Sequence, residues 1–332
     1  DSQPWDSQPH DLQQQGVQHN WIRSLTLRPD VSTTEKASLT PKTFLDQQIP
    51  LLRDPQAREL AERVNWWRLP EMEAPWNELN FPVCISGSGS PVLLLHGFDS
   101  SFLEFRRLVP LLRPHHQLVI PDLHGFGFCP RPVEQAYGPE NVIRHLEEIL
   151  NGLASEQPIG VIGASMGGSV AIELARRQPH RIKRLLLLAP AGLTGRPMPV
   201  PPLLDQLGVW FLSLPSVRRG LCRQAFADPQ TRVGAAEEQI ASLHLQIPGW
   251  AEALGCFARS GGFAGCGSPL PEIPLQVIWG TDDRILSGAQ KNAAIALLGS
   301  KVEELSNCGH LPHLDHPEIV AERWLEQDFG SS

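Results

Sequence analysis

From about residue 81 onward the sequence alternates short apolar runs with amphipathic stretches, and this alternation limits the possible folds more than any other feature. Between the runs, apolar residues recur at helical spacing in two stretches, at residues 102–112 and 142–153. Strands that alternate with helices are typical of a parallel sheet with helices on both faces. We therefore predict an α/β fold whose strands span residues 91–96, 117–121, 159–164, 184–189, 275–279 and 301–305.

The alternation is interrupted once, by a cluster of prolines followed by helical stretches and a glycine-rich exit. We expect this interruption, residues 193–268, to form a helical cap. The cap would be inserted into a core made of residues 81–192 and 269–332.

The chain before the core divides into two parts. Residues 1–45 are rich in Gln, Ser and Pro and are expected to be disordered. Residues 46–80 are expected to form an extension with a docked helix, because Leu60, Val64 and Trp67 recur at helical spacing.

The charge and the cysteines argue against several partners. A formal net charge of −8 gives no electrostatic reason to bind nucleic acid or an anionic membrane. The six cysteines include no Cys-x-x-Cys pair, so neither a disulfide framework nor a thiolate zinc site is expected. No apolar run approaches the roughly 20 residues that span a bilayer, so no transmembrane segment is expected.

A Gly-x-Ser-x-Gly sequence, from Gly163 to Gly167, follows one predicted strand directly and precedes a helical run at residues 169–177. A sharp turn between a strand and a helix lifts its central serine clear of the sheet, and the glycines permit that turn. The sequence is also compatible with a glycine-rich turn that merely contains a serine. The strand, turn and helix context favours Ser165 as a nucleophile.

A serine hydroxyl is a poor nucleophile until a base accepts its proton. His310 follows the last predicted strand and precedes a helix that starts near Pro317, which places it at the carboxyl edge of the sheet. His313 and His316 follow at steps of three, so a metal site is an alternative, but Pro312 and Pro317 interrupt a continuous helical face. We predict His310 as the base and expect no metal and no cofactor.

The base needs a carboxylate to orient it. The loop after the predicted strand at residues 275–279 contains both Asp282 and Asp283. Either aspartate could instead be a solvated turn residue, since Asp is common in turns. Position alone leaves both candidates open.

An oxyanion hole needs two N–H donors aimed at the carbonyl oxygen that becomes charged. The amide of Met166, directly after the nucleophile, is the first candidate, and the amide of Phe98, after the strand at residues 91–96, is the second. We expect Gly97 to permit the bend there, and His96 to be a buried, hydrogen-bonded residue that shapes the loop.

Five motifs in this order resemble the α/β-hydrolase superfamily from roughly residue 81 to the C-terminus. They are residues 96–98, 122–127, 163–168, 279–283 and 309–312. The resemblance implies a mostly parallel sheet with a helical cap. It also implies that the acid is the last residue of the Trp-Gly-x-x-Asp block, here Asp283, and that His310 is the histidine of the Gly-His-x-Pro motif.

Residues 95–101, with Glu104 and the arginine pair 106–107 after them, are similar to cyanobacterial and plastid members, a group with relatives that act on chlorophyll esters. The location implied is the cytoplasm, or the plastid stroma if the chain is a processed precursor. Cys129 departs from the pattern, because many relatives have serine there.

The resemblance implies a soluble serine hydrolase that cleaves a carboxylic ester through an acyl-enzyme. A small, apolar ester is the expected substrate, because apolar cap residues, among them Trp210 and Phe211, are expected to line the pocket. A carbon-carbon bond hydrolase, an acyltransferase and a non-catalytic binding or receptor module remain alternatives. Haloalkane dehalogenases and epoxide hydrolases need an aspartate nucleophile, so Ser165 argues against both. The oligomeric state stays open.

Overall fold

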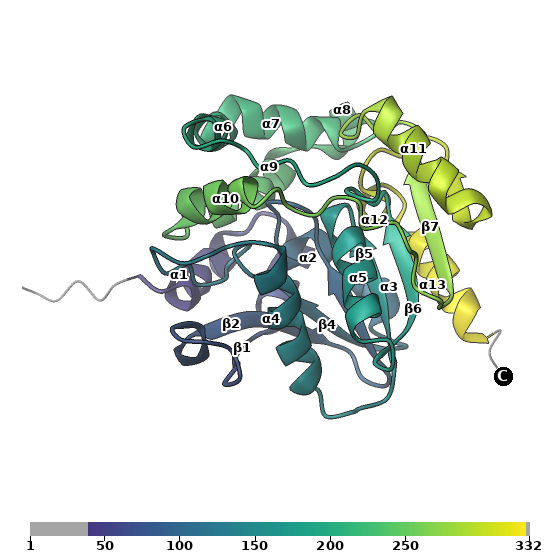
Figure 1. Cartoon of the computed structure of the whole chain (residues 1–332), viewed down its shortest axis with the longest axis horizontal. Coiled ribbons are helices and arrows are strands. Elements are labelled where there is room, and N and C mark those ends of the chain that lie inside the picture. Colours follow the sequence, from purple (N-terminus) through teal and green to yellow (C-terminus); the bar gives the residue numbers. More distant parts are fainter. Residues whose placement is uncertain (1–38, 330–332) are drawn as a thin grey trace, which may run out of the picture. The chain divides into compact units, whose positions relative to one another are not determined.

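The computed structural model describes residues 39–329, which contain an eight-stranded sheet of order β1-β2-β4-β3-β5-β6-β7-β8 (Figure 1). Strands β3 to β8 run parallel, whereas β2 is antiparallel to both β1 and β4. The prediction of a mostly parallel sheet is therefore confirmed. The strands are β1 (Val64–Arg68), β2 (Asn80–Ser86), β3 (Pro91–Leu95), β4 (Gln117–Pro121), β5 (Ile159–Ala164), β6 (Ile182–Leu188), β7 (Leu275–Gly280) and β8 (Val302–Leu305).

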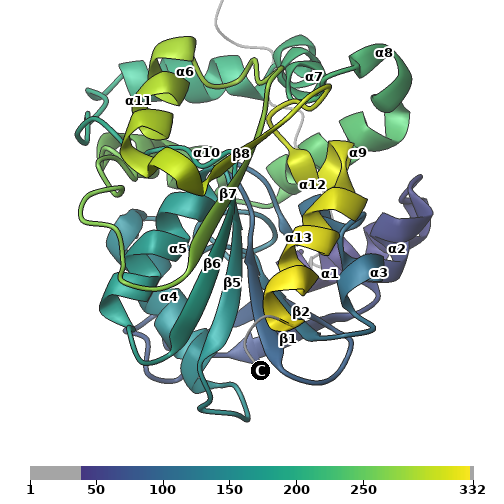
Figure 2. The same ribbon diagram turned by 90° about the vertical axis from the view of Figure 1, so that its right-hand side faces the viewer.

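Helices cover both faces of the sheet (Figure 2). One face packs against α4 (Pro139–Asn151), α5 (Met166–Arg177) and α11 (Gly288–Leu298). The other face packs against α1 (Pro41–Gln48), α2 (Pro55–Ala61), α3 (Val109–Leu112) and α13 (Pro317–Phe329). Because both faces are buried, the central strands are apolar throughout rather than alternating.

The N-terminal extension differs from the sequence prediction. Helix α2 is the expected docked helix, but Val64 and Trp67 lie in β1, which pairs with β2 from Val64↔Cys84 to Arg68↔Asn80. The helical spacing was misleading because β1 is partly covered on both faces. Val64 packs against one core cluster, and Trp67, three residues later and therefore on the opposite face of the strand, packs against the other. The predicted disordered arm lies outside the described residues except for its end, which is ordered from Pro41 as α1.

The predicted helix over residues 102–112 is split in two. A 3-10 turn, η3 (Phe102–Phe105), precedes the short α3. Pro110 is the cause, because proline lacks the N–H that would bond to residue 106 and its ring would clash with that carbonyl. Phe102, Leu103, Phe105, Val109 and Leu112 of these two pieces are nevertheless buried.

The segment between β6 and β7 is helical, as predicted for the cap. It contains α6 (Leu204–Ser213), α7 (Pro215–Gln224), α8 (Pro229–Arg232), α9 (Ala235–Leu243) and α10 (Trp250–Arg259). Figure 1 shows these helices together on one side of the sheet. Leu212 and Leu221 of this segment line the same cavity as Ser165. No helix within residues 39–329 is long and apolar enough to cross a membrane.

Candidate active site

Ser165 stands on a strained turn between β5 and α5. Its backbone has φ 52° and ψ −119°, a conformation that side-chain-bearing residues rarely adopt. The turn is fixed on both sides, because the Ser165 N–H donates to the Leu188 carbonyl and the Ser165 carbonyl accepts from Gly168. These hydrogen bonds hold the strained turn in place, and with it the serine hydroxyl at the carboxyl edge of the sheet.

Two glycines allow the backbones to approach closely around this turn. A Cβ on Gly163 would collide with the backbone of Gly167, and a Cβ on Gly167 would collide with the carbonyl of Leu95. Any larger residue at either position would push the turn away from β3. Their predicted site-shaping role thus has a steric basis.

The structure brings Ser165, His310 and Asp283 together. His310 Nε2 lies 2.8 Å from Ser165 Oγ, and His310 Nδ1 lies 2.9 Å from Asp283 Oδ2. The three come from turns after β5, β8 and β7 respectively, so the parallel sheet delivers them to one edge. Such a chain of hydrogen bonds can move a proton from the serine to the imidazole.

Asp283, and not Asp282, makes this contact. The Asp283 side chain is fully buried and also accepts from the indole of Trp279 at 2.9 Å and from the N–H of Ile285 at 2.9 Å. Burial would raise the pKa of this carboxyl, but the contacts with His310 and Trp279 outweigh it and hold the pKa below its ordinary value. Asp282 is exposed.

The loop that carries His310 is held by a residue the sequence analysis did not single out. Asp315 Oδ2 accepts from Gly309 N at 2.7 Å and from Ala227 N, in the cap, at 3.0 Å. The backbone N–H of His310 also donates to the carbonyl of Ala225, in the cap, at 2.8 Å. The position of the histidine therefore depends on the cap as well as on the core.

The loop after β3 reaches the site as expected. His96 is fully buried, with Nδ1 2.8 Å from the Gly97 carbonyl and Nε2 accepting from Leu123 N at 3.0 Å. Burial lowers the pKa of His96 to about 4, so this side chain is neutral and shapes the loop. Phe98 lines the cavity next to Ser165, while Met166 is the first residue of α5, where helix N–H groups lack intrahelical acceptors.

Glu104 supports the same loop. Its Oε2 accepts from Gly97 N at 3.3 Å, and its Oε1 lies 3.0 Å from Nε2 of the buried His313. Burial would raise the pKa of this carboxyl, but His313, His96 and Ser100 outweigh it and lower the pKa to about 2. An ionised carboxylate thus lies directly behind the predicted oxyanion loop.

Asp99 joins this loop to the cap. Its Oδ1 lies 3.0 Å from Nε2 of His244 and accepts from the indole of Trp250 at 2.8 Å, while Oδ2 accepts from Arg218 at 2.5 Å. Burial would raise the pKa of Asp99, but His244 and Arg218 hold it well below the ordinary value. All three partners are cap residues from α7, η4 (His244–Gln246) and α10.

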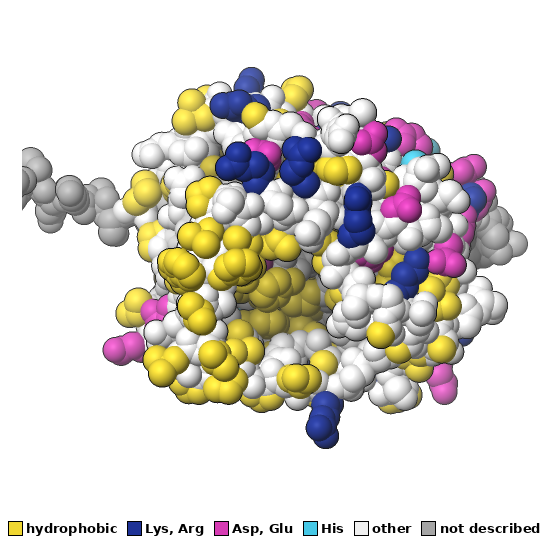
Figure 3. Space-filling view, turned by 90° about the horizontal axis from the view of Figure 1, so that it is seen from above, with side chains coloured by type: hydrophobic (Ala, Val, Ile, Leu, Met, Phe, Trp, Pro, Cys, Tyr) yellow, Lys and Arg dark blue, Asp and Glu magenta, His cyan; other side chains and the backbone are white. Residues whose placement is uncertain are grey.

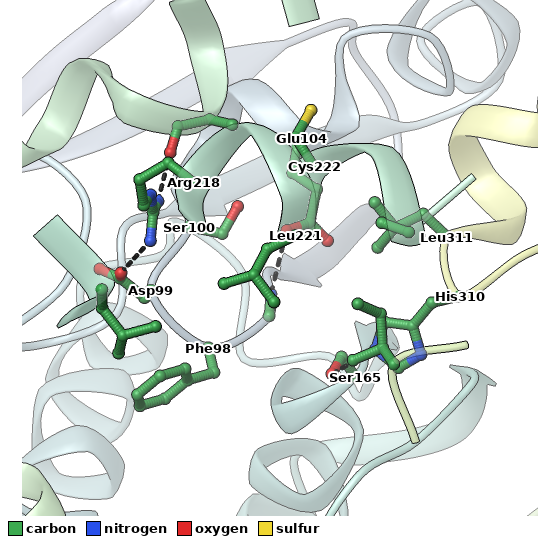
Figure 4. A pocket seen from close by; sticks show the side chains of 15 residues that line it. Phe98, Asp99, Ser100, Glu104, Ser165, Arg218, Leu221, Cys222, His310 and Leu311 are labelled. Carbon is green, nitrogen blue, oxygen red and sulfur yellow. Dashed lines mark hydrogen bonds and ion pairs between the residues drawn. The ribbon is translucent and has the colours of Figure 1, made fainter. Parts of the chain in front are cut away.

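A cavity of about 380 Å³ opens onto Ser165 and His310 (Figure 4). Its apolar wall comes from the core and the cap, and its polar part includes the Asp99–Arg218 pair and Glu104. Trp210 and Phe211, which were expected to line this pocket, are absent from its wall: Trp210 lines a separate cavity and Phe211 is exposed. The apolar lining residues are Phe98, Leu212, Leu221, Ala225, Ala241, Ile285 and Leu311.

The three histidines after β8 do not converge. His310 contacts Ser165, His313 faces Glu104, and His316 Nε2 lies 2.9 Å from the carbonyl of Asn307. Within residues 39–329 no group of His, Cys, Asp or Glu side chains is arranged to hold a metal ion.

A serine, a histidine and an aspartate joined by hydrogen bonds at the carboxyl edge of a capped, mostly parallel sheet are typical of α/β hydrolases. The comparison with protein families agrees. The model of the alpha/beta hydrolase family matches residues 92–323, and the chain belongs to this family.

Three relatives show the range of chemistry in this family. The chain is 29% identical to the alpha/beta hydrolase domain-containing protein VTE7 of Arabidopsis thaliana, over 87% of this chain and 90% of that protein. It is 27% identical to a 2-hydroxymuconate semialdehyde hydrolase of Pseudomonas sp. strain CF600, over 70% and 84%. It is 28% identical to the monoacylglycerol lipase abhd6-B of Xenopus laevis, over 80% and 85%. The chain is thus a hydrolase of the α/β superfamily.

Proposed function

We propose that the protein cleaves a carboxylic ester of an apolar substrate through an acyl-enzyme, with Ser165 as nucleophile, His310 as base and Asp283 as the orienting acid. The observation that supports this most strongly is the continuous chain of hydrogen bonds from Ser165 through His310 to Asp283. The alternative of a non-catalytic binding module would not require this geometry.

In the first half of the reaction, His310 Nε2 removes the proton from Ser165 as the serine Oγ attacks the ester carbonyl. The carbonyl oxygen becomes an anion, which the N–H groups of Phe98 and Met166 would stabilise. His310 then gives its proton to the alcohol oxygen, the carbon-oxygen bond of the ester breaks, and the acyl group stays on Ser165. Asp283 stabilises the imidazolium that forms during these steps.

In the second half, His310 removes a proton from a water molecule, which attacks the acyl carbonyl. The tetrahedral anion collapses, the bond to Ser165 Oγ breaks, and His310 returns the proton to that oxygen. The products are a carboxylic acid and free enzyme.

The wall of the cavity favours an uncharged substrate. Among residues 39–329, most of those that line it are apolar, and the one arginine there is paired with Asp99. A second carboxylate, Glu104, also faces the cavity, so a free carboxylate on the substrate would meet more negative than positive charge. Each methylene buried against the apolar wall contributes roughly 0.8 kcal/mol to binding.

Carbon-carbon bond hydrolysis is the second candidate, because the similarity to a 2-hydroxymuconate semialdehyde hydrolase covers 70% of the chain. The same serine and histidine could serve that reaction. Kinetics on a neutral medium-chain ester and on 2-hydroxymuconate semialdehyde, which is anionic, would separate the two. Faster turnover of the semialdehyde would replace the ester proposal.

Labelling with a fluorophosphonate probe tests the nucleophile. Native protein should gain one covalent phosphonyl group, and Ser165→Ala should gain none and lose essentially all ester turnover while keeping its thermal unfolding midpoint. Ser169→Ala is the matched control, since this buried serine lies one helical turn further along α5 and bonds to the Ala191 carbonyl. Unchanged labelling of Ser165→Ala would overturn the assignment.

A further inference from the structure

Helix α6 of the cap has apolar residues on two opposite sides. One side faces the protein, where Val209 is buried and the buried Asp205 pairs with Arg259 of α10. The residues on the other side follow each other at helical spacing and form one continuous face. A surface helix normally carries polar residues there.

We call this exposed face, with the residues just before it, the α6 face. It consists of Met198, which is 77% exposed, Leu203 at 73%, Leu204 at 57%, Leu207 at 57%, Trp210 at 58% and Phe211 at 53%. Leu203, Leu204, Leu207, Trp210 and Phe211 follow each other at helical spacing, so they form an apolar patch of the kind that marks an interaction surface. Met198 adds a further exposed apolar side chain in the segment before the helix. Figure 3 shows hydrophobic side chains gathered around a hollow on the side of the molecule that carries α6 and α7.

The α6 face is continuous with the proposed active site. Leu212 belongs to the same helix and lines the cavity at Ser165, and Leu221 of α7 lines that cavity while being 36% exposed. Figure 4 shows Leu221 between Phe98 and His310. Apolar side chains of α6 and α7 thus lie both on the exposed surface and in the wall of the cavity, next to the polar Asp99–Arg218 pair and Glu104.

The exposed charges within the segment that carries the α6 face, residues 193–223, are all arginines, and Glu252 of α10 lies beside Trp210 in the neighbouring cavity. Residues 193–223 contain four arginines and one aspartate, although the whole chain has a formal net charge of −8. Arg196, Arg219 and Arg223 are exposed, whereas Asp205 is buried and paired with Arg259. The net charge of the whole chain argued against an anionic membrane as a partner, but the exposed charges of this segment are positive.

We propose that the α6 face docks on a lipid bilayer with anionic headgroups, from which an apolar ester passes directly to the cavity. Exposed Leu, Trp and Phe side chains insert at the boundary between headgroups and acyl chains, and neighbouring arginines pair with anionic headgroups. A second copy of the chain is a poorer occupant, because a two-fold contact through this face would bring the same arginines together.

Flotation with vesicles tests the docking directly, and it does not depend on the proposed chemistry when the full chain carries Ser165→Ala. Vesicles of phosphatidylcholine alone are compared with vesicles that also contain phosphatidylglycerol. Binding should be stronger to the anionic vesicles and should weaken with added salt. Leu204→Ser with Leu207→Ser should reduce binding at least tenfold, and Arg219→Ala with Arg223→Ala should remove the preference for anionic vesicles.

The matched control is Leu51→Ser with Val133→Ser, which removes apolar side chains that are 61% and 64% exposed on other parts of the surface. These changes should leave vesicle binding as it is. In an otherwise native chain, Leu204→Ser with Leu207→Ser should also keep full fluorophosphonate labelling, which shows that the protein remains folded. Equal vesicle binding of the α6 and control variants would overturn the proposal. So would a concentration-dependent dimer that these two α6 changes dissociate.

Discussion

At the scale of single residues, two adjacent aspartates differ completely in environment. Asp283 is buried against His310 and Trp279, whereas Asp282 points to solvent and contributes its backbone N–H to the Cys308 carbonyl. The Trp-Gly-x-x-Asp motif favoured Asp283, but both residues follow the same strand. The hydrogen bond between Asp283 and His310 in the folded chain agrees with the motif.

Asp283→Asn should therefore lower kcat by about 10³-fold or more, because an amide would hold His310 in the wrong tautomer. Asp282→Asn, the matched control, should change kcat by less than about twofold, since it alters only an exposed side chain. Steady-state kinetics on one neutral ester gives both values. Equal losses would mean that Asp283 does not orient the base.

Glu104 gives a prediction for stability against pH. Its pKa is about 2 in the folded protein and about 4.5 ordinarily, so the folded state favours the ionised form. The stability this carboxylate contributes is fully present above about pH 4.5 and is lost as the pH falls towards 2. Glu104→Gln should lower the free energy of unfolding at neutral pH, and its difference from native protein should shrink between about pH 5 and about pH 3.

Urea unfolding at several pH values measures this difference. The matched control is Glu71→Gln, which alters an exposed carboxylate. A native-to-variant difference that stays constant down to about pH 3 would show that the folded state does not lower the pKa of Glu104.

At the scale of elements, the parallel strands could be predicted from the sequence, whereas the two strands at the antiparallel edge of the sheet could not. The predicted strands at residues 117–121 and 159–164 match β4 and β5, and the others differ only at their ends, because continuous apolar runs are typical of buried parallel strands. Strands β1 and β2 escaped prediction. They lie at the antiparallel edge, where pairing between strands, rather than a continuous apolar run, decides the conformation.

The contact between the loop after β3 and the cap predicts a large effect of Arg218. Arg218→Met removes the cation from a buried pair and leaves Asp99 with an uncompensated charge, which should cost about 3 kcal/mol of unfolding free energy. Arg219→Met, one residue later and exposed, should cost less than about 0.5 kcal/mol. Urea unfolding compares the two, and similar values would show that the buried pair does not anchor the cap.

At the scale of the whole molecule, the N-terminal helices are part of the folded core. Asp54 caps α2 by accepting from Gln56 N and Ala57 N, and it also accepts from Arg106 at 2.9 Å. Arg106 is itself almost fully buried. The predicted boundary between extension and core therefore does not separate independent units within residues 39–329.

Asp54→Ala should lower the free energy of unfolding by about 3 kcal/mol, because it removes a helix cap and leaves Arg106 without one of its partners. Asp46→Ala breaks only an exposed pair with Lys42 and should cost less than about 0.5 kcal/mol. A single cooperative transition is expected in both variants. Separate unfolding of residues 39–61 would contradict this view of the core.

The triad could be predicted from the sequence because each member follows a strand in a short, recognisable motif. Asp99, Glu104 and Asp315 could not, because their roles depend on contacts over long distances in the chain. Asp99 meets Arg218 across 119 residues and Trp250 across 151. Sequence spacing carries no signal for such contacts, and only the fold creates them.

The contacts between Asp99 and the cap also limit which segments can be exchanged between this protein and its relatives. A cap taken from a relative and inserted between β6 and β7 would arrive without counterparts of Arg218, His244 and Trp250, unless these positions came with it. The buried Asp99 carboxylate would then lack its partners, and it would move towards solvent and displace the neighbouring backbone of Phe98. A functional chimaera therefore has to inherit the cap and the loop after β3 together, as one inseparable module.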